Sequence, residues 1–296
     1  MTLATKEFSA SNTWDGGAVM IHGINNTGKT KLACAIAAHE AKVGRVYVLS
    51  FAQEMGYSSA AGMGLDKGEL GYQALYEAES MDDWDKFMDM VEKDNKAGKK
   101  ARCIVMDSTK AAYDAVQAAK TGGERPVTSG KSDNNEWPVC HLWMYNRMTR
   151  MRKLSDFFIA TCPSDAGVSQ LKEVETGVKG DTIVVPDLNG KLATGCSTWF
   201  NLICYLMADS IKKGTSYTIK RSLACGYSTR YWTRQRMPMN GLSELIDVPE
   251  GEPVKAWIRL RELADKLYAE AYERSRTTAT VSKGVAKEEQ GKVPSV

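Results

Sequence analysis

The sequence predicts an α/β fold, in which helices flank a mostly parallel sheet and late strands add as a meander. Two observations predict this class. Short apolar runs suited to buried strands alternate with helical segments through the first half of the chain, as in parallel sheets with crossover helices. Later, the apolar runs at 199–207 and 216–225 follow one another without a helix between them, as antiparallel neighbours do.

The first predicted strand, at 18–21, leads into a glycine-containing loop and then a helix at 29–42. The loop reads Gly23-Ile24-Asn25-Asn26-Thr27-Gly28-Lys29-Thr30, which matches the phosphate-binding pattern G-x-x-x-x-G-K-[ST]. The glycines let backbone N–H groups wrap the phosphates, Lys29 reaches the β and γ oxygens, and the Thr30 hydroxyl suits Mg²⁺. We therefore expect all eight residues to bind ATP with Mg²⁺, although the loop alone does not distinguish ATP from GTP.

Residues 45–51 form the next predicted strand, and residues 72–97 are predicted to be helical. An apolar run at 102–107 then ends in Asp107, the Walker B pattern of a strand closed by an acid. Such an acid holds the Mg²⁺ shell, usually through water. The expected metal-site residues are therefore Thr30 and Asp107.

Hydrolysis also needs a group that orients the attacking water, expected near the end of a neighbouring strand. Gln53 and Glu54 follow the strand at 45–51. We assign the role to Glu54 because a carboxylate accepts a proton. The alternative is that Glu54 is a solvated turn residue.

A helix predicted at 139–154 overlaps a segment, 137–153, that interleaves aromatic and basic side chains. Arginines bind backbone phosphates and aromatic rings stack on bases, so this mixture suits single-stranded nucleic acid. The alternative is a helix whose apolar stripe faces the core while its basic residues stay in water. That stripe would consist of Leu142, Tyr145, Met148 and Leu154.

After a strand predicted at 156–162 and a hairpin or excursion around 182–186, the two late strands lead to a basic cluster of Arg230, Arg234 and Arg236. An arginine from another subunit is a common source of positive charge for the γ-phosphate. We assign this role to Arg234 and Arg236. The alternative is a solvated strand end.

The chain is predicted to divide into a core at 1–250, an amphipathic helix at 251–275 and a disordered tail at 276–296. The helix is predicted from apolar residues at i, i+3 and i+4 spacing, among them Trp257, Leu260 and Ala264. The tail lacks bulky apolar residues apart from isolated valines.

Composition limits the alternatives. The net charge of +3 is too small to indicate a nucleic-acid-binding protein by itself, so any basic surface would have to be local. The seven cysteines include no C-x-x-C pair, which argues against a zinc site or a disulfide framework and favours reduced thiols. There is neither a signal-peptide pattern nor an apolar run of about 18 residues, so we expect a cytoplasmic protein without a membrane association.

In order along the chain, these motifs resemble the RecA-like P-loop ATPases of bacteriophage, in particular the Sak-type single-strand annealing and recombination ATPases, which are AAA-domain nucleotide-binding proteins. The matching features span 18–238. They are the phosphate loop, Asp107-Ser108 after its apolar run, the helix led by Trp137, the strand at 157–162, the P-x-L-x-G-K element at 186–191 and the R-x-R at 234–236.

The resemblance implies subunits stacked in a ring or filament, with Arg234 or Arg236 reaching a neighbouring subunit's nucleotide. It therefore implies a homo-oligomer with intersubunit ATP sites that acts on single-stranded DNA in phage recombination, annealing or replication, in the host cytoplasm if phage-encoded. The chief alternative is an ATPase for another partner, such as a helicase loader or packaging component, without DNA pairing. A small-molecule kinase is a further alternative, for which the basic cluster at 230–236 lies too close to the end of the core to form the expected lid.

Overall fold

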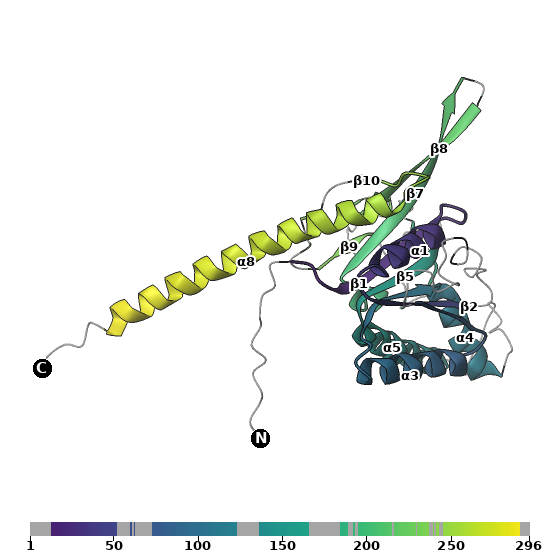
Figure 1. Cartoon of the computed structure of the whole chain (residues 1–296), viewed down its shortest axis with the longest axis horizontal. Helices are drawn as coiled ribbons and strands as arrows, with labels where there is room; N and C mark the ends of the chain where they lie inside the picture. The colour runs from purple at the N-terminus through teal and green to yellow at the C-terminus, as the bar shows by residue number, and fades with distance from the viewer. Residues whose placement is uncertain are drawn as a thin grey trace, which may run out of the picture.

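A mixed sheet forms the centre of the structure, with helices on both of its faces (Figure 1). The computed structural model describes residues 13–51, 60, 62, 73–122, 136–165, 184–188, 192, 195–214, 216–228, 230–236, 239, 241–242 and 245–290. In the described part the strand order is β10-β8-β7-β1-β5-β4-β2-β3, with β6 paired to β5 and β9 to β7.

The parallel part of the sheet comprises β1 (Gly17–Gly23), β2 (Arg45–Phe51), β3 (Gln73–Ala78), β4 (Ala101–Asp107), β5 (Ser155–Asp165) and β7 (Leu202–Lys213). The antiparallel additions are β6 (Val185–Pro186), β8 (Ser216–Ala224), β9 (Arg234–Gln235) and β10 (Leu245–Asp247). The predicted α/β class, with a mostly parallel sheet and late antiparallel strands, is confirmed.

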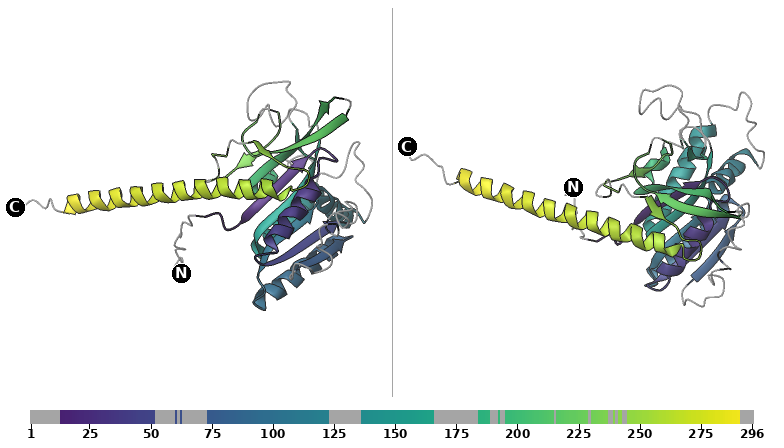
Figure 2. Two further views of the ribbon diagram at one scale, coloured as in Figure 1. Left: turned by 45° about the horizontal axis from the view of Figure 1, so that its top comes forward. Right: turned by 90° about the horizontal axis from the view of Figure 1, so that it is seen from above.

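Helices α1 (Lys29–Glu40) and α8 (Val254–Gln290) pack on one face of the sheet, and α3 (Met81–Lys96), α4 (Thr109–Thr121) and α5 (Glu136–Leu154) pack on the other (Figures 1 and 2). Alternate residues of β1 pack against the two helical layers: Val19 and Ile21 face α1, whereas Met20 faces the α3–α5 side. A strand buried on both faces reads as a continuous apolar run, which explains why its sequence pattern was clear.

One predicted element is wrong at its start. Residues 73–78, expected as the beginning of a helix, form the edge strand β3, which pairs in parallel with β2. The helix begins only at Met81, because the Ser80 hydroxyl accepts a hydrogen bond from the Asp83 backbone N–H (3.2 Å) and caps it. Ser80-x-x-Asp83 is a helix-start signal that separates the two elements.

The C-terminal helix is longer than expected. We predicted its end at 275, but α8 continues to Gln290, away from the sheet (Figure 1). The extension mixes strong helix formers, such as Ala, Lys, Glu and Gln, with Thr, Val, Ser and Gly, whose intrinsic helix propensity is low. Its local sequence therefore does not mark where the helix ends. No helix in the described part of the chain is long and apolar enough to cross a membrane.

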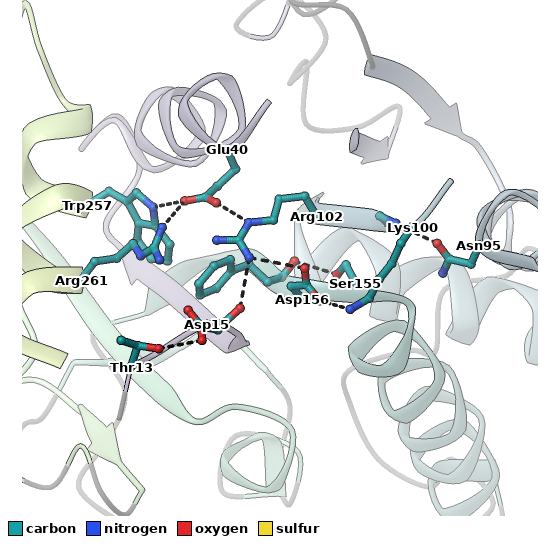
Figure 3. Close-up of polar contacts among 12 residues, drawn as sticks. Thr13, Asp15, Glu40, Asn95, Lys100, Arg102, Ser155, Asp156, Trp257 and Arg261 are labelled. Atoms are coloured by element: carbon teal, nitrogen blue, oxygen red, sulfur yellow. Dashed lines mark hydrogen bonds and ion pairs between the residues drawn. The ribbon is translucent and has the colours of Figure 1, made fainter. Parts of the chain in front are cut away.

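The buried carboxylate of Glu40 links α8 to the rest of the fold through hydrogen bonds (Figure 3). Glu40, at the end of α1, is completely buried and accepts hydrogen bonds from Trp257 Nε1 (2.8 Å), Arg261 Nη1 (3.2 Å) and Arg102 Nε (2.8 Å). Arg102 also pairs with Asp156 (3.4 Å) at the start of β5. This network therefore lies at the amino edge of the parallel strands and joins α1, α8, β4 and β5.

All seven cysteines are buried and free. Burial raises the pKa of the Cys34 thiol to about 12, with the nearby Asp107 carboxylate adding to the shift. The thiol therefore stays protonated at neutral pH and offers no nucleophile.

Candidate nucleotide site

The predicted phosphate loop joins β1 to α1 at the carboxyl edge of the parallel strands. Asn26 (φ 65°) and Gly28 (φ 97°) both have left-handed backbone conformations. A Cβ on Gly23 would lie 2.6 Å from the Leu206 carbonyl oxygen and 2.9 Å from Thr27 Oγ1, so only glycine fits there. Gly28 also precedes α1 without a side-chain cap, which leaves the first N–H groups of the helix for a ligand.

Lys29 lies over the loop. Its Nζ donates hydrogen bonds to the backbone oxygens of Gly23 (2.9 Å) and Ile24 (3.0 Å). The ammonium is thereby held above the backbone that would receive phosphate, and it provides the positive charge expected of this position.

Asp107 connects three elements beneath the loop. Its side chain is buried, with 2% of its surface exposed, and Oδ2 accepts a hydrogen bond from Thr30 Oγ1 (2.9 Å). Oδ1 accepts from Thr161 Oγ1 on β5. The hydroxyl of Thr30 and the carboxylate of Asp107 therefore meet as predicted, and hard oxygen donors of this kind fit Mg²⁺.

A cavity of about 500 Å³ opens between the phosphate loop and these polar side chains. Its size suits a nucleotide-sized ligand. It is lined by Asn25, Asn26, Gly28, Lys29, Thr30, Lys31, Asp107, Ser108 and Thr161.

Two polar residues beside Asp107 were not predicted from the sequence. Thr161 is one of them, and Ser50 is the other, since strand pairing places it opposite Asp107. Ser50 is 1% exposed, and its hydroxyl has no hydrogen-bond partner among the described residues. Both lie in predicted strands that are buried on both faces, and a continuous apolar run does not reveal which polar residue lies beside the carboxylate.

The residue predicted to orient the attacking water, Glu54, lies outside the described residues, as does Gln53. The assignment of Glu54 therefore stays a prediction.

Arg234 and Arg236 lie away from the phosphate loop of their own chain. Arg234 Nη1 donates to Ser197 Oγ (2.9 Å), and Arg236 Nη2 donates to the Ser197 carbonyl (3.0 Å). Strand β9 places Arg234 opposite Ile203 near the start of β7, whereas the loop follows the carboxyl end of β1. Their predicted role at a neighbouring subunit's nucleotide stays a prediction.

Another arginine, which the sequence analysis did not single out, does contact the loop. Arg221, on β8, donates from Nε to the Thr27 carbonyl oxygen (3.0 Å), and its side chain is 19% exposed. Nearby, Lys31 Nζ donates to the Glu250 carbonyl (3.2 Å), so the segment after β10 also borders the loop. The hairpin that returns Arg221 to the loop is a tertiary feature, which residue spacing alone does not predict.

His22 lies directly before the loop and is fully buried. Its Nε2 is 2.6 Å from the Trp232 carbonyl oxygen, and its Nδ1 is 2.8 Å from Ser164 Oγ. Because a carbonyl only accepts, Nε2 carries the hydrogen and Nδ1 accepts from the Ser164 hydroxyl. Burial, opposed by the Trp232 hydrogen bond and aided by the Lys29 charge, lowers the pKa of His22 to about 3, so the ring is neutral and structural.

Two of the four basic residues of α5 pair with acids of α3. Arg147 pairs with Asp85 (2.5 Å), and Arg150 pairs with Asp89 (2.5 Å) and Glu92 (2.8 Å), all on α3. Arg152 donates instead to the Thr198 carbonyl (3.0 Å), and Lys153 is exposed. Among the described residues, therefore, about half of the positive charge of this segment is paired with acids.

The alternative apolar stripe on α5 is correct only in part. Met148 and Leu154 are buried as expected, but Leu142 and Tyr145 are exposed. The buried positions of this helix are Cys140, Met144, Met148, Met151 and Leu154.

A family profile described as an AAA domain matches residues 16–237. A search of curated proteins found no match.

Two solved structures are similar to this chain. One is an ATPase from the type III secretion system of pathogenic bacteria (13% identity, TM-score 0.43); the match covers 65% of this chain and 52% of that one, so this chain spans about half of that ATPase. The other is the flagellar accessory protein FlaH from Methanocaldococcus jannaschii (14% identity, TM-score 0.42), with coverage of 79% of this chain and 86% of that one.

Proposed function

The chain belongs to the AAA-domain family, and on that premise we propose that it is a Mg²⁺-dependent ATP-hydrolysing protein that acts on single-stranded DNA. The observation that carries the ATP-hydrolysing part of the proposal is the meeting of Thr30, Asp107 and Thr161 beneath a phosphate loop whose backbone requires glycine. The resemblance to Sak-type phage ATPases favours a role in recombination, annealing or replication.

Each residue has a physical task in this proposal. The N–H groups at the start of α1 and the Lys29 ammonium bind phosphate oxygens, and Thr30 and Asp107 hold the metal. When bound, Mg²⁺ neutralises charge on the phosphate oxygens as it redistributes during hydrolysis. Thr161 fixes the Asp107 carboxylate through its hydrogen bond, which keeps one oxygen directed toward Thr30.

The proposal includes an assembly of identical subunits. Within one chain the exposed Arg234 contacts Ser197 rather than the phosphate loop, so a role in phosphate chemistry needs a second chain. We propose that Arg234 or Arg236 enters the site of a neighbouring subunit and supplies positive charge to the γ-phosphate.

The test is the rate of ATP hydrolysis with and without single-stranded DNA. We expect DNA to raise the rate, and we expect Asp107→Asn to reduce it at least about 100-fold, because the metal loses its charged ligand. Asp114→Asn, a carboxyl paired with Lys110 on α4, is the matched control and should retain the rate. A rate indifferent to DNA would favour an ATPase for another partner, whereas an Asp107→Asn protein with full activity would refute the proposed site.

A further inference from the structure

One hairpin stands beyond the edge of the sheet that carries the nucleotide site (Figures 1 and 2). Strand β7 is level with the end of β1 at Tyr205, which pairs with His22, but β7 continues to Lys213. The chain turns at Gly214 (φ 63°), and β8 returns. At about 3.3 Å per residue, residues 206–213 extend about 25 Å beyond the pairing of Tyr205 with His22 near the end of β1. We refer to residues 208–221 as the projecting hairpin.

The register of the two strands divides the projecting hairpin into two faces. Ala208 pairs with Arg221, Ser210 with Ile219 and Lys212 with Tyr217, so these six residues share one face. Because Arg221 on this face donates to the Thr27 carbonyl of the phosphate loop, we name it the loop-side face. Asp209, Ile211, Thr218 and Lys220 lie on the opposite face.

The loop-side face presents an aromatic ring and a cation together. Tyr217 is 68% exposed and Ile219 is 46% exposed. Lys212, directly across from Tyr217, is exposed and forms no ion pair with an acid in the described part of the chain. On the opposite face, by contrast, Lys220 pairs with Asp247 (3.4 Å).

Charge on the projecting hairpin is concentrated relative to the rest of the chain. It carries four basic residues against the single acid Asp209, a net charge of +3, which equals the net charge of all 296 residues. The remainder of the chain is therefore neutral overall, and this hairpin is a local basic surface. Lys220 and Arg221 pair with Asp247 and Glu250 outside it, which leaves Lys212 and Lys213 toward the tip. A polyanion is the complementary partner.

We propose that the loop-side face of the projecting hairpin binds single-stranded nucleic acid, with Tyr217 stacking on an unpaired base and Lys212 contacting backbone phosphate. An exposed ring beside a cation is the combination that single-strand binders use, because every unpaired base offers a face for stacking. The inference rests on the proposed function, and it names the surface through which that function meets DNA.

Two other readings of these residues are less favourable. A second copy of the chain docked symmetrically on this face would bring two hairpins of the same net charge together, which is repulsive. The basic helix α5 is a weaker nucleic-acid surface, because Arg147 and Arg150 already pair with acids of α3.

The experiment is a fluorescence anisotropy titration of a labelled oligo-dT with the full chain, in Mg²⁺ and a non-hydrolysable ATP analogue, at several salt concentrations. We expect Tyr217→Ser to weaken binding about tenfold, through the loss of one stacked base. We expect Lys212→Ser to lower the slope of log affinity against log salt by about 0.7, since one phosphate contact is lost. The matched control, Lys220→Ser, removes an equal charge from the opposite face and should change affinity less than about threefold.

The outcomes separate this inference from the function on which it rests. If wild-type protein binds the oligonucleotide and both loop-side variants bind equally well, the hairpin assignment is wrong while DNA binding stands. If Lys220→Ser loses as much as Lys212→Ser, the face assignment is wrong. If Tyr217→Ser changes only the particle size in light scattering, the face joins copies of the chain instead. If wild-type protein binds the ATP analogue but no DNA, the proposed function fails as well.

Discussion

Asp107 is the residue on which the site depends, because its two carboxylate oxygens are shared between α1 and β5. Thr30 is placed on one oxygen by the first turn of α1, and Thr161 on the other by the neighbouring strand. The Walker B position was predictable, since an apolar run closed by an acid has few other meanings beside a phosphate loop. The partner Thr161 was not, because its place beside Asp107 follows from the alignment of β4 and β5.

The contact of Arg221 with the phosphate loop also depends on long-range structure. Its hydrogen bond to the Thr27 carbonyl depends on the length of β7 and on the turn at Gly214. Nothing local in its sequence neighbourhood distinguishes it from the other basic residues of the late strands, so the prediction favoured the denser cluster at 230–236.

His22 predicts a dependence of stability on pH. Its pKa is about 3 in the folded state and about 6.5 when unfolded, so between these values only the unfolded state takes up the proton. Stability is therefore full above pH 6.5 and is lost as pH falls. We expect the free energy of unfolding to be about 2 kcal/mol lower at pH 5 than at pH 8 from this residue alone.

The measurement is urea unfolding of wild-type protein and His22→Gln at both pH values. The variant lacks the titrating ring, so its stability should change less between pH 8 and pH 5 than that of wild type. An equal change in the two proteins would contradict the assignment of a buried neutral His22.

At the scale of elements, the sequence predicts the strands that are buried on both faces. It misplaces elements whose sequence resembles that of the segment beside them. Strands β1, β2, β4 and β5 were predictable because both of their faces are buried. Strand β3 was not, because an edge strand carries fewer apolar residues, and Gln73–Ala78 resembles the polar helix that follows it. The end of α8 was misplaced because the helix continues there without an apolar stripe.

The docking of α8 on α1 gives a prediction about stability. Replacing Glu40 with Ala leaves Arg102 and Arg261 without their shared buried acceptor, so we expect the free energy of unfolding to fall by about 3 kcal/mol. Glu262→Ala, which removes an exposed acid paired with Arg259 on the same helix, is the matched control and should change it by less than about 1 kcal/mol. Chemical unfolding measures both, and equal stability of the two variants would contradict the role of the Glu40 network.

At the scale of the whole molecule, the candidate nucleotide site and the Glu40 network that holds α8 lie at opposite edges of the same sheet. The phosphate loop, Asp107 and the base of the projecting hairpin lie at the carboxyl edge, whereas Glu40 and Arg102 join α8 at the amino edge (Figures 1 and 3). Ligands of open α/β sheets bind at the carboxyl edge, so the placement of the site follows from the parallel strand direction. This part of the account was predictable from the order of elements along the chain.

The central claim is that the loop Gly23–Thr30 binds ATP with Mg²⁺ through Lys29, Thr30 and Asp107. Equilibrium titration of a fluorescent ATP analogue, with and without Mg²⁺, tests it most directly. We expect wild-type protein to bind more tightly with Mg²⁺ present, and Lys29→Ala to weaken binding at least about tenfold, since a charged contact to phosphate is lost. Unchanged binding by a folded Lys29→Ala protein would contradict the account.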